Sequence, residues 1–463
     1  MGFSNLEFLY IFLPLFCAAY YLMPQRGRNH LLLFGSVGFY VLCCLDSPAA
    51  IVLLAVSTVL NWLLGMQIEQ SGQTRRLWLW LGIVWNIASL FFFKYAHAVA
   101  PDFFDSLGNI GFSTVALPIG ISFYSFRAVG YLADVTHARC YSEKRFDRFA
   151  LWMWMFPTVL QGPITRYPAM QEELVSREHS LPKYMSGLRT FVLGLGYKAL
   201  IADRLFRMWG KVLDMGWDSV SSGLAWLAAV AYALFIYFDF AGYSLMAIGV
   251  GRMLGFELPE NFRAPYISKS MTEFWRRWHI TLGNWFRDCI YIPLGGNRHG
   301  TLRTVLNLFA VWLFTGIWHG STWTFVAWGM FLFAVILLEK FFLKKYLDKS
   351  RVLCHIYMAF LIVISWAIFA SGDLTGLCDM FRRLFPFLPQ KELWYMSGDA
   401  WNMLQGYWPY LLAGLLCCFG LPEFLHRKSE GSLFWDLVLI VIFCASVYFI
   451  YTVGADPFAY GNF

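Results

Sequence analysis

The sequence predicts an all-α polytopic membrane protein with about ten to twelve membrane-crossing helices and additional re-entrant segments. Of the 463 residues, 59% are hydrophobic and only 14% are charged. Several windows reach the length of about 20 apolar residues that crosses a bilayer. Soluble domains carry roughly 25% charged residues, so this composition excludes a water-soluble fold. The short alternating segments of a β-barrel would not give such long apolar runs.

Apolar segments mark the candidate helices in chain order. They cover 7–23, 31–45, 49–66, 78–95, 114–135, 187–207, 222–254, 303–318, 322–341, 352–371, 407–421 and 433–452. No internal repeat or low-complexity tract divides them, so the simplest organisation is one integral domain over residues 1–463. The apolar stretch 149–163 is too short to cross the membrane and return. It is predicted to be re-entrant, surrounded by protein or by a water-filled cavity.

Lysine and arginine in the short loops predict the orientation. The basic loops are 24–30, 72–76, 137–148 and 344–351, whereas 45–50 and 100–109 are not basic. Because basic loops favour the cytoplasm, they are placed inside and both termini outside. The long loop 373–405 carries charges of both signs and is given less weight. The net charge of +7 is attributed to the cytoplasmic loops, and nucleic acid is not expected as a partner.

The segment SKSMTEFWRRWHITLGNWFRDCIYIPLGGNR, 268–298, combines arginine, tryptophan and histidine. Ser270 and Glu273 have capping-box spacing, which predicts the start of a helix. Four positions recur at helical spacing on one face: Trp275, His279, Leu282 and Phe286. A basic helix on the cytoplasmic membrane surface would explain most of this pattern. It does not explain His279, which lies on the apolar side.

His319 lies in the apolar stretch LFTGIWHGSTWTFVAWG, 313–329. The apolar run from Leu306 to Ile317 before it corresponds to about 18 Å of helix, whereas the hydrocarbon core is about 30 Å thick. If both flanking segments are cytoplasmic, His319 is predicted at a helix break inside the membrane, where an ionisable residue suggests a function. An earlier start of the helix would place His319 closer to the outer face. The alternative is a neutral histidine that is hydrogen-bonded to a neighbouring carbonyl.

Other polar residues in apolar segments are interpreted as structural. Arg127 and Asp134 are seven residues apart on one helical face, and we expect them to pair through neighbours. Asp239 lies between Tyr237 and Tyr243, whose hydroxyls are candidate partners. These residues are predicted to hold the shape of a cavity inside the helix bundle.

Two histidines in such a cavity suit general-base chemistry. An imidazole near its reference pKa can take a proton from a hydroxyl as that oxygen attacks a carbonyl. The sequence has no GxSxG motif, no phosphate-binding GxxxxGK[ST] loop and no metal-ligand spacing of its histidines, carboxylates or ten cysteines. Acyl transfer from an activated donor fits what remains. A transporter with a proton-relay histidine is the alternative, although no inverted repeat supports it.

The motifs FWRRWHITLGNWFRDCIYIPLGGNR and GIWHGSTWTFVAWG resemble those of the membrane-bound O-acyltransferase family. The motifs LPIGISFYSF, LQGPITR, FDFAGYSLMAIG and PENFRAPYIS match in the same order. The chain is most similar to the bacterial branch of alginate O-acetylases and teichoic acid D-alanyltransferases. This resemblance implies a ring of helices around a central tunnel. It also implies a family core at 114–345 between N-terminal helices 1–110 and C-terminal helices 352–463.

The resemblance also implies a function. A multi-pass protein of the bacterial inner membrane, surrounded by membrane lipid, would take an acyl group from a cytoplasmic acyl-CoA or acyl carrier protein thioester. It would pass the group to a hydroxyl of a cell-surface polysaccharide, or to an extracytoplasmic acetyltransferase acting as partner. Acetyl is the expected group and D-alanyl is the alternative. Neither a bound cofactor nor a metal is expected.

The family motifs imply roles for individual residues. His319 matches the essential histidine of the family, and His279 matches its second histidine. Both are predicted to be catalytic, with His319 as the general base and His279 positioning the donor or shaping the tunnel. The candidates for substrate contact are Trp275, Asn284, Trp285, Trp318, Asp239 and Tyr243.

Overall fold

The computed structural model describes residues 2–99, 118–389, 396–454, 456 and 458. Within these ranges it contains helices and no β-strand. The chain divides into two compact units: Met1–Phe191 with Tyr243–Glu260, and Val192–Gly242 with Asn261–Phe463. The division passes through two helices, α10 (Leu181–Gly196) and α12 (Ser222–Met253), so each contributes to both units.

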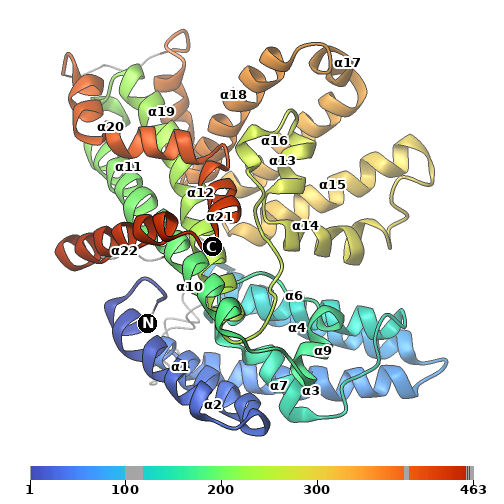
Figure 1. The fold of residues 1–463 in the computed structure, drawn as a ribbon. Helices are drawn as coiled ribbons and strands as arrows, with labels where there is room; N and C mark the ends of the chain where they lie inside the picture. The colour runs from blue at the N-terminus through green and yellow to red at the C-terminus, as the bar shows by residue number, and fades with distance from the viewer. Residues whose placement is uncertain (1, 100–117, 390–395, 455, 457, 459–463) are drawn as a thin grey trace, which may run out of the picture. The chain divides into compact units, whose positions relative to one another are not determined.

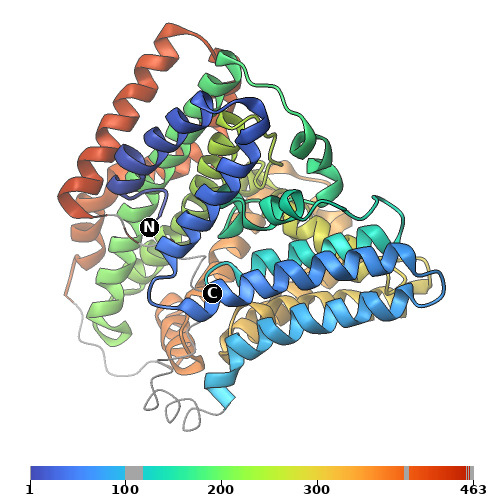
Figure 2. The same cartoon turned by 90° about the horizontal axis from the view of Figure 1, so that it is seen from below.

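The first unit is built from the N-terminal helices. They are η1 (Phe8–Phe12), α1 (Leu13–Leu22), α2 (Gln25–Cys43), α3 (Pro48–Gln70), α4 (Arg75–Val99), α6 (Ile121–Thr136), α7 (Phe146–Trp154), α8 (Phe156–Val159) and α9 (Tyr167–Val175). Helices α3, α4 and α6 pack side by side (Figures 1 and 2). Between α3 and α4, Nδ2 of Asn86 donates to Oδ1 of Asn61 over 2.8 Å. Such buried amide contacts help to hold membrane helices together.

The stretch predicted to be re-entrant is a broken helix in this unit. Helix α7 ends at Trp154, Met155 leaves the helical conformation with ψ 113°, and the four-residue α8 follows. The backbone carbonyls at the end of α7 have lost their helical partners. Arg127 of α6 replaces them by donating to the carbonyl oxygens of Trp152 and Met153, over 2.8 and 2.6 Å. The stretch is buried among protein, the surroundings that irregular backbone needs in a membrane.

Arg127 and Asp134 do not form the predicted pairing. Arg127 also donates to Oγ1 of Thr158 over 2.8 Å, so its guanidinium is held by the α7–α8 segment. Asp134 instead accepts two hydrogen bonds from Arg166, 2.9 Å from Nε and 2.5 Å from Nη2. The two residues are separate anchors, one for the broken helix and one for the start of α9.

The second unit contains the C-terminal half of the chain. After η2 (Tyr197–Ala202) and α11 (Asp203–Met215) come η3 (Trp217–Ser219), α12, η4 (Pro265–Ile267), α13 (Met271–Arg277), α14 (Ile280–Phe286), η5 (Arg287–Tyr291), α15 (Gly300–His319), α16 (Trp323–Leu338), η6 (Glu339–Leu343), α17 (Lys344–Leu347), α18 (Arg351–Ala370), α19 (Leu374–Leu384), α20 (Asp399–Cys417), α21 (Leu421–Ser429) and α22 (Leu433–Val453). The most extensive packing in this unit joins α15 and α16 into a hairpin.

The α15–α16 hairpin needs glycine where its backbones meet. A Cβ atom at Gly329 would lie 2.5 Å from the carbonyl oxygen of Trp312. A Cβ atom at Gly316 would lie 2.6 Å from the carbonyl oxygen of Phe325. Neither backbone oxygen can move without shifting its helix. Small residues let membrane helices approach in this way.

Gly329→Ala is therefore expected to destabilise the protein by about 1–3 kcal/mol, the usual cost of overpacking. Thermal unfolding in detergent, followed by size-exclusion chromatography of the heated samples, measures this loss. Gly406→Ala is the matched control, because a Cβ atom at that helical glycine meets nothing within 4 Å. Equal unfolding temperatures for the two variants would show that α15 and α16 can move apart without loss of stability.

The number of membrane-crossing helices is smaller than predicted. The apolar segments are largely helical, although residues 114–117 lie outside the described ranges. Only seven described helices are long and apolar enough to cross, or up to eight if the bent pair α20–α21 is one span. The prediction of ten to twelve overcounted because α6 has only 16 residues and α2 begins with the polar sequence QRGRNH. The chain is nevertheless a polytopic α-helical membrane protein.

Candidate active site

His279 occupies a sharp break between two short helices. The predicted helix start is confirmed at α13, where Oγ of Ser270 accepts from the backbone N–H of Glu273 over 3.1 Å. The Glu273 carboxylate accepts from the N–H of Lys269 over 3.0 Å. The single helix predicted to continue through His279 is wrong. Helix α13 ends at Arg277, and α14 begins at Ile280. His279 itself has φ 43° and ψ 55°, a left-handed conformation that is rare outside glycine.

Asn261 holds this break in place. Its backbone carbonyl accepts from the N–H of Ile280 over 2.9 Å. Its side-chain Oδ1 accepts from the backbone N–H and the hydroxyl of Thr281, over 3.3 and 2.9 Å. The same Oδ1 lies 3.0 Å from Nδ1 of His279. An amide oxygen only accepts, so Nδ1 carries the proton and the lone pair of the neutral ring is on Nε2.

His279 is kept uncharged by its surroundings. The side chain is 2% exposed, and the ring of Phe240 packs edge-on against it with centroids 4.7 Å apart. Burial lowers the pKa of His279 to about 3, because the imidazolium form loses its hydration. The residue lies outside the candidate spans, and it is neutral across the physiological range.

Asn261→Asp tests the neutral state of His279. Aspartate keeps the acceptor for His279 and Thr281 but adds a negative charge beside Nδ1, which raises the pKa of His279. If the neutral ring is needed, the transfer rate of the variant falls as the pH drops through the raised pKa, and recovers at higher pH. Rates measured between about pH 5 and 8 would show this acid limb. Asn261→Ala is the control, and it should lower the transfer rate without adding a fall in rate at acidic pH. Identical pH–rate profiles for Asn261→Asp and wild type would contradict a role for neutral His279.

His319 is the last residue of α15, and the predicted break follows it at residues 320–322. The helix starts at Gly300, earlier than predicted, so its 20 residues are about 30 Å long. This earlier start is the case in which His319 lies closer to the outer face, at the end of a full-length candidate span, and its depth in the membrane stays a prediction. Its ring is 3% exposed and is surrounded by aromatic rings. The rings of Trp318, Trp328 and Phe369 have centroids 4.4, 5.0 and 5.2 Å away.

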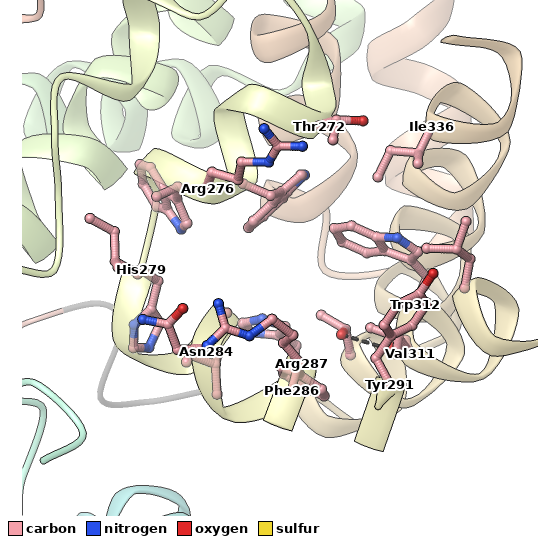
Figure 3. Close-up of a pocket in the computed structure, with 18 residues that line it drawn as sticks. Thr272, Arg276, His279, Asn284, Phe286, Arg287, Tyr291, Val311, Trp312 and Ile336 are labelled. Carbon is pink, nitrogen blue, oxygen red and sulfur yellow. Dashed lines mark hydrogen bonds between the residues drawn. The ribbon is translucent and has the colours of Figure 1, made fainter. Parts of the chain in front are cut away.

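One pocket of about 420 Å³ in the second unit is lined by both histidines. Figure 3 shows this pocket. Its polar lining residues are Thr272, Arg276, His279, Asn284, Arg287, Thr315 and His319. Its apolar wall contains Trp275, Trp278, Ile280, Leu282, Phe286, Tyr291, Leu308, Val311, Trp312 and Ile336. In Figure 3, Thr272 and Arg276 of α13 lie across the cavity from Asn284 and Arg287. A mostly apolar cavity with a few polar groups is typical of small-ligand sites.

The other predicted contact residues fall into three groups. Trp275 and Asn284 line the pocket. Trp285 and Trp318 are buried nearby but are not among its lining residues, although Trp318 packs on His319. Asp239 and Tyr243 lie elsewhere. Tyr243 belongs to the first unit and stacks on Phe3 with centroids 5.0 Å apart.

Asp239 forms a buried ion pair. Its Oδ1 lies 2.7 Å from Nζ of Lys198, which also lies 2.8 Å from Oδ1 of Asp203. All three side chains are almost fully buried. The prediction of a structural role fits this geometry, but the partner Lys198 was not predicted. The only signal for it was a lysine within the apolar segment 187–207.

The sequence interpretation also missed Asn261, Arg276 and Arg287 as site residues. Arg276 and Arg287 belong to the segment that was interpreted as a basic helix on the membrane surface, whereas both line the pocket. Asn261 belongs to the motif PENFRAPYIS, but nothing in that motif indicates that its side chain reaches His279. The pocket thus combines two buried imidazoles with two guanidinium groups in a largely apolar cavity. An imidazole can accept a proton there, and the guanidinium groups can bind an anionic part of a thioester ligand.

Comparison with known proteins identifies the family to which the segment containing this site belongs. The family model of the membrane-bound O-acyltransferases matches residues 74–359, more than half of the chain, and the matched range includes both histidines. The chain belongs to the membrane-bound O-acyltransferase family. This membrane-bound O-acyltransferase is thus an enzyme with several membrane-spanning helices.

Similar proteins are named for acyl transfer to alginate, peptidoglycan and teichoic acid. The chain is 34% identical to a probable alginate O-acetylase of Pseudomonas putida, with both chains covered completely. It is 30% identical to a peptidoglycan O-acetyltransferase of Helicobacter pylori over 87% of this chain and 83% of that protein. It is also 30% identical to a teichoic acid D-alanyltransferase of Streptococcus thermophilus, over 50% of this chain and 60% of that protein. The O-acetylating relatives therefore match more of this O-acyltransferase than the D-alanylating one.

Proposed function

We propose that this enzyme moves an acetyl group from a cytoplasmic thioester donor across the membrane to a hydroxyl acceptor on the other side. The observation that carries the proposal is the pocket lined by both His279 and His319. Its largely aromatic and aliphatic wall is suited to limiting contact between a bound thioester and water, which would slow hydrolysis. The O-acetylating relatives support acetyl as the group.

His319 is the proposed general base. Its imidazole takes the proton of the acceptor hydroxyl as that oxygen attacks the thioester carbonyl carbon. The tetrahedral intermediate then collapses, the carbon–sulfur bond breaks, and the thiolate leaves with the proton returned by the imidazolium. The products are an ester and a free thiol, so no net proton is consumed.

His279 is proposed to position the donor. With its proton on Nδ1, the Nε2 atom can accept a hydrogen bond but cannot donate one to a developing oxyanion. An amide N–H of the donor is a suitable partner for such an acceptor. Arg276 and Arg287 line the same pocket, and their guanidinium groups suit a phosphate carried by the donor. Acyl-CoA and an acyl carrier protein both provide these groups.

The proposed acceptor is a cell-surface polysaccharide, reached either directly or through a partner acetyltransferase outside the bacterial inner membrane. The relatives named for alginate and peptidoglycan support a polymer of the envelope. A transporter without acyl chemistry is not proposed, because the chain is an O-acyltransferase by family. D-alanyl transfer from a carrier protein remains the second candidate, because half of the chain is similar to a D-alanyltransferase.

Mass analysis of the cell envelope with and without the gene separates the two candidates. Loss of an acetyl ester from a polysaccharide is expected, whereas loss of a D-alanyl ester would favour the second candidate. Reconstitution of the purified chain with labelled acetyl thioester and polymer then separates direct transfer from a relay. Efficient labelling of the polymer without a partner protein would exclude the relay.

A further inference from the structure

Three lysines surround a hollow at the end of the α15–α16 hairpin away from His319. The hollow has a volume of about 300 Å³ and is lined by Lys340, Phe341, Phe342, Lys344, Lys345 and Asp348. These residues belong to η6, to α17 and to the turn after it, between α16 and α18 (Figure 1). The hollow is separate from the histidine pocket and plays no part in the proposed reaction.

A π-helical turn gathers the lysines. In η6 the backbone N–H of Lys344 bonds to the carbonyl oxygen of Glu339, five residues earlier. In an α-helix, residues five apart point in different directions. The wider π turn brings residues i and i+5 towards the same face, here Lys340 and Lys345. Such turns often occur at functional sites.

The positive charge of this hollow is not neutralised by the protein. Among the described residues, Lys340, Lys344 and Lys345 form no salt bridge with a carboxylate within 4.0 Å, and all three are exposed. Asp348 is the single acidic residue in the lining. The neighbouring carboxylate of Glu339 is directed inward and is 3% exposed. Uncompensated lysines around a hollow are suited to a phosphate group.

The rim of the hollow is apolar and aromatic. Phe342 is 64% exposed, and Phe341 and Tyr346 are also exposed. Lys345 lies 4.9 Å from the ring centroid of Tyr346. Exposed aromatic rings next to lysines are typical of the membrane interface, where rings insert among acyl chains and ammonium groups contact head groups. We propose that this hollow binds the phosphate head group of an acidic phospholipid.

Glu339 connects this lipid site to the histidine pocket. Its carboxylate accepts from the backbone N–H groups of Met271 and Thr272, over 2.6 and 3.2 Å. Those residues begin α13, and Thr272 lines the histidine pocket. A lipid that orders the π turn at Lys340 therefore also orders the anchor of α13. This inference does not depend on which acyl group or acceptor the enzyme uses.

Native mass spectrometry of the purified full-length protein tests the lipid site. The probes are short-chain phosphatidylglycerol, short-chain phosphatidylcholine and glycerol phosphate. Wild type should bind phosphatidylglycerol more tightly than either of the others. Replacing both Lys344 and Lys345 with glutamine should weaken that binding roughly tenfold or more, since two of the three ammonium groups that attract the anionic head group are removed.

The matched control replaces Arg427 and Lys428 with glutamine, which removes the same charge from an exposed part of α21. The control should bind phosphatidylglycerol like wild type. Equal binding by the Lys344/Lys345 variant, with an unchanged unfolding temperature, would overturn the proposal. Glycerol phosphate binding as tightly as phosphatidylglycerol would also overturn it, by showing that the hollow takes a free phosphate. These readouts do not use transfer activity, so they are independent of the proposed reaction.

Discussion

Replacing His319 with alanine is expected to lower the rate of acyl transfer by about 10²–10⁴-fold, the usual contribution of a general base. The protein should still fold. The replacement removes the imidazole ring of His319, which packs among aromatic side chains at the end of α15. It leaves the backbone contacts of Gly316 and Gly329 in the α15–α16 hairpin intact. Thioester consumption and ester formation in reconstituted vesicles measure the loss. Both should fall together.

His299→Ala is the matched control for this variant. His299 is the N-cap residue at the opposite end of the same helix, and it is exposed. Its replacement should leave the transfer rate close to that of wild type. A wild-type rate for His319→Ala in folded protein would contradict the general-base role. Loss of ester formation with continued thioester consumption would show that His319 directs the acyl group without activating the acceptor.

Replacing Arg127 with methionine is expected to destabilise the protein by about 3 kcal/mol or more. The variant leaves the carbonyl oxygens of Trp152 and Met153 buried without the guanidinium, and each unsatisfied buried group costs about 1–3 kcal/mol. The oxygen atoms cannot turn to water, because this end of α7 is enclosed by protein. A lower unfolding temperature and a lower yield of monodisperse protein in detergent measure the effect.

Arg139→Met provides the comparison for Arg127. Arg139 follows α6 by three residues, and its contact with Asp134 is a 3.4 Å ion pair with the arginine 45% exposed. Asp134 is buried but keeps its two hydrogen bonds from Arg166, so loss of the exposed, longer contact with Arg139 should cost no more than about 1 kcal/mol. The control should therefore unfold near the wild-type temperature. Equal stability of both variants would mean that other groups satisfy the carbonyls of the broken helix.

The positions of the helices were largely predictable, because a long apolar run has few stable structures in lipid other than a helix. The number of spans was not. Composition does not reveal that α6 is too short to cross or that α7 breaks at Met155. The break after α7 is held by Arg127, whose partners lie 25 to 31 residues further along the chain.

The two histidines of the site were predictable because ionisable residues are rare on apolar faces. The conformation of His279 was not. No glycine or proline marks the break at residues 278–279, and the turn is held by Asn261, 18 residues earlier. The ion pair of Lys198 with Asp239 spans 41 residues. Such long-range partners are set by tertiary packing, which local spacing does not encode.

Transfer across a sealed bilayer tests the central claim most directly. Proteoliposomes are loaded with an acetyl thioester, labelled in its acetyl group, and the hydroxyl acceptor or partner acetyltransferase is supplied only outside. Labelled ester is expected outside and free thiol inside, with both lost in His319→Ala. Ester formed only when donor and acceptor share one compartment would contradict a site that joins the two sides of the membrane.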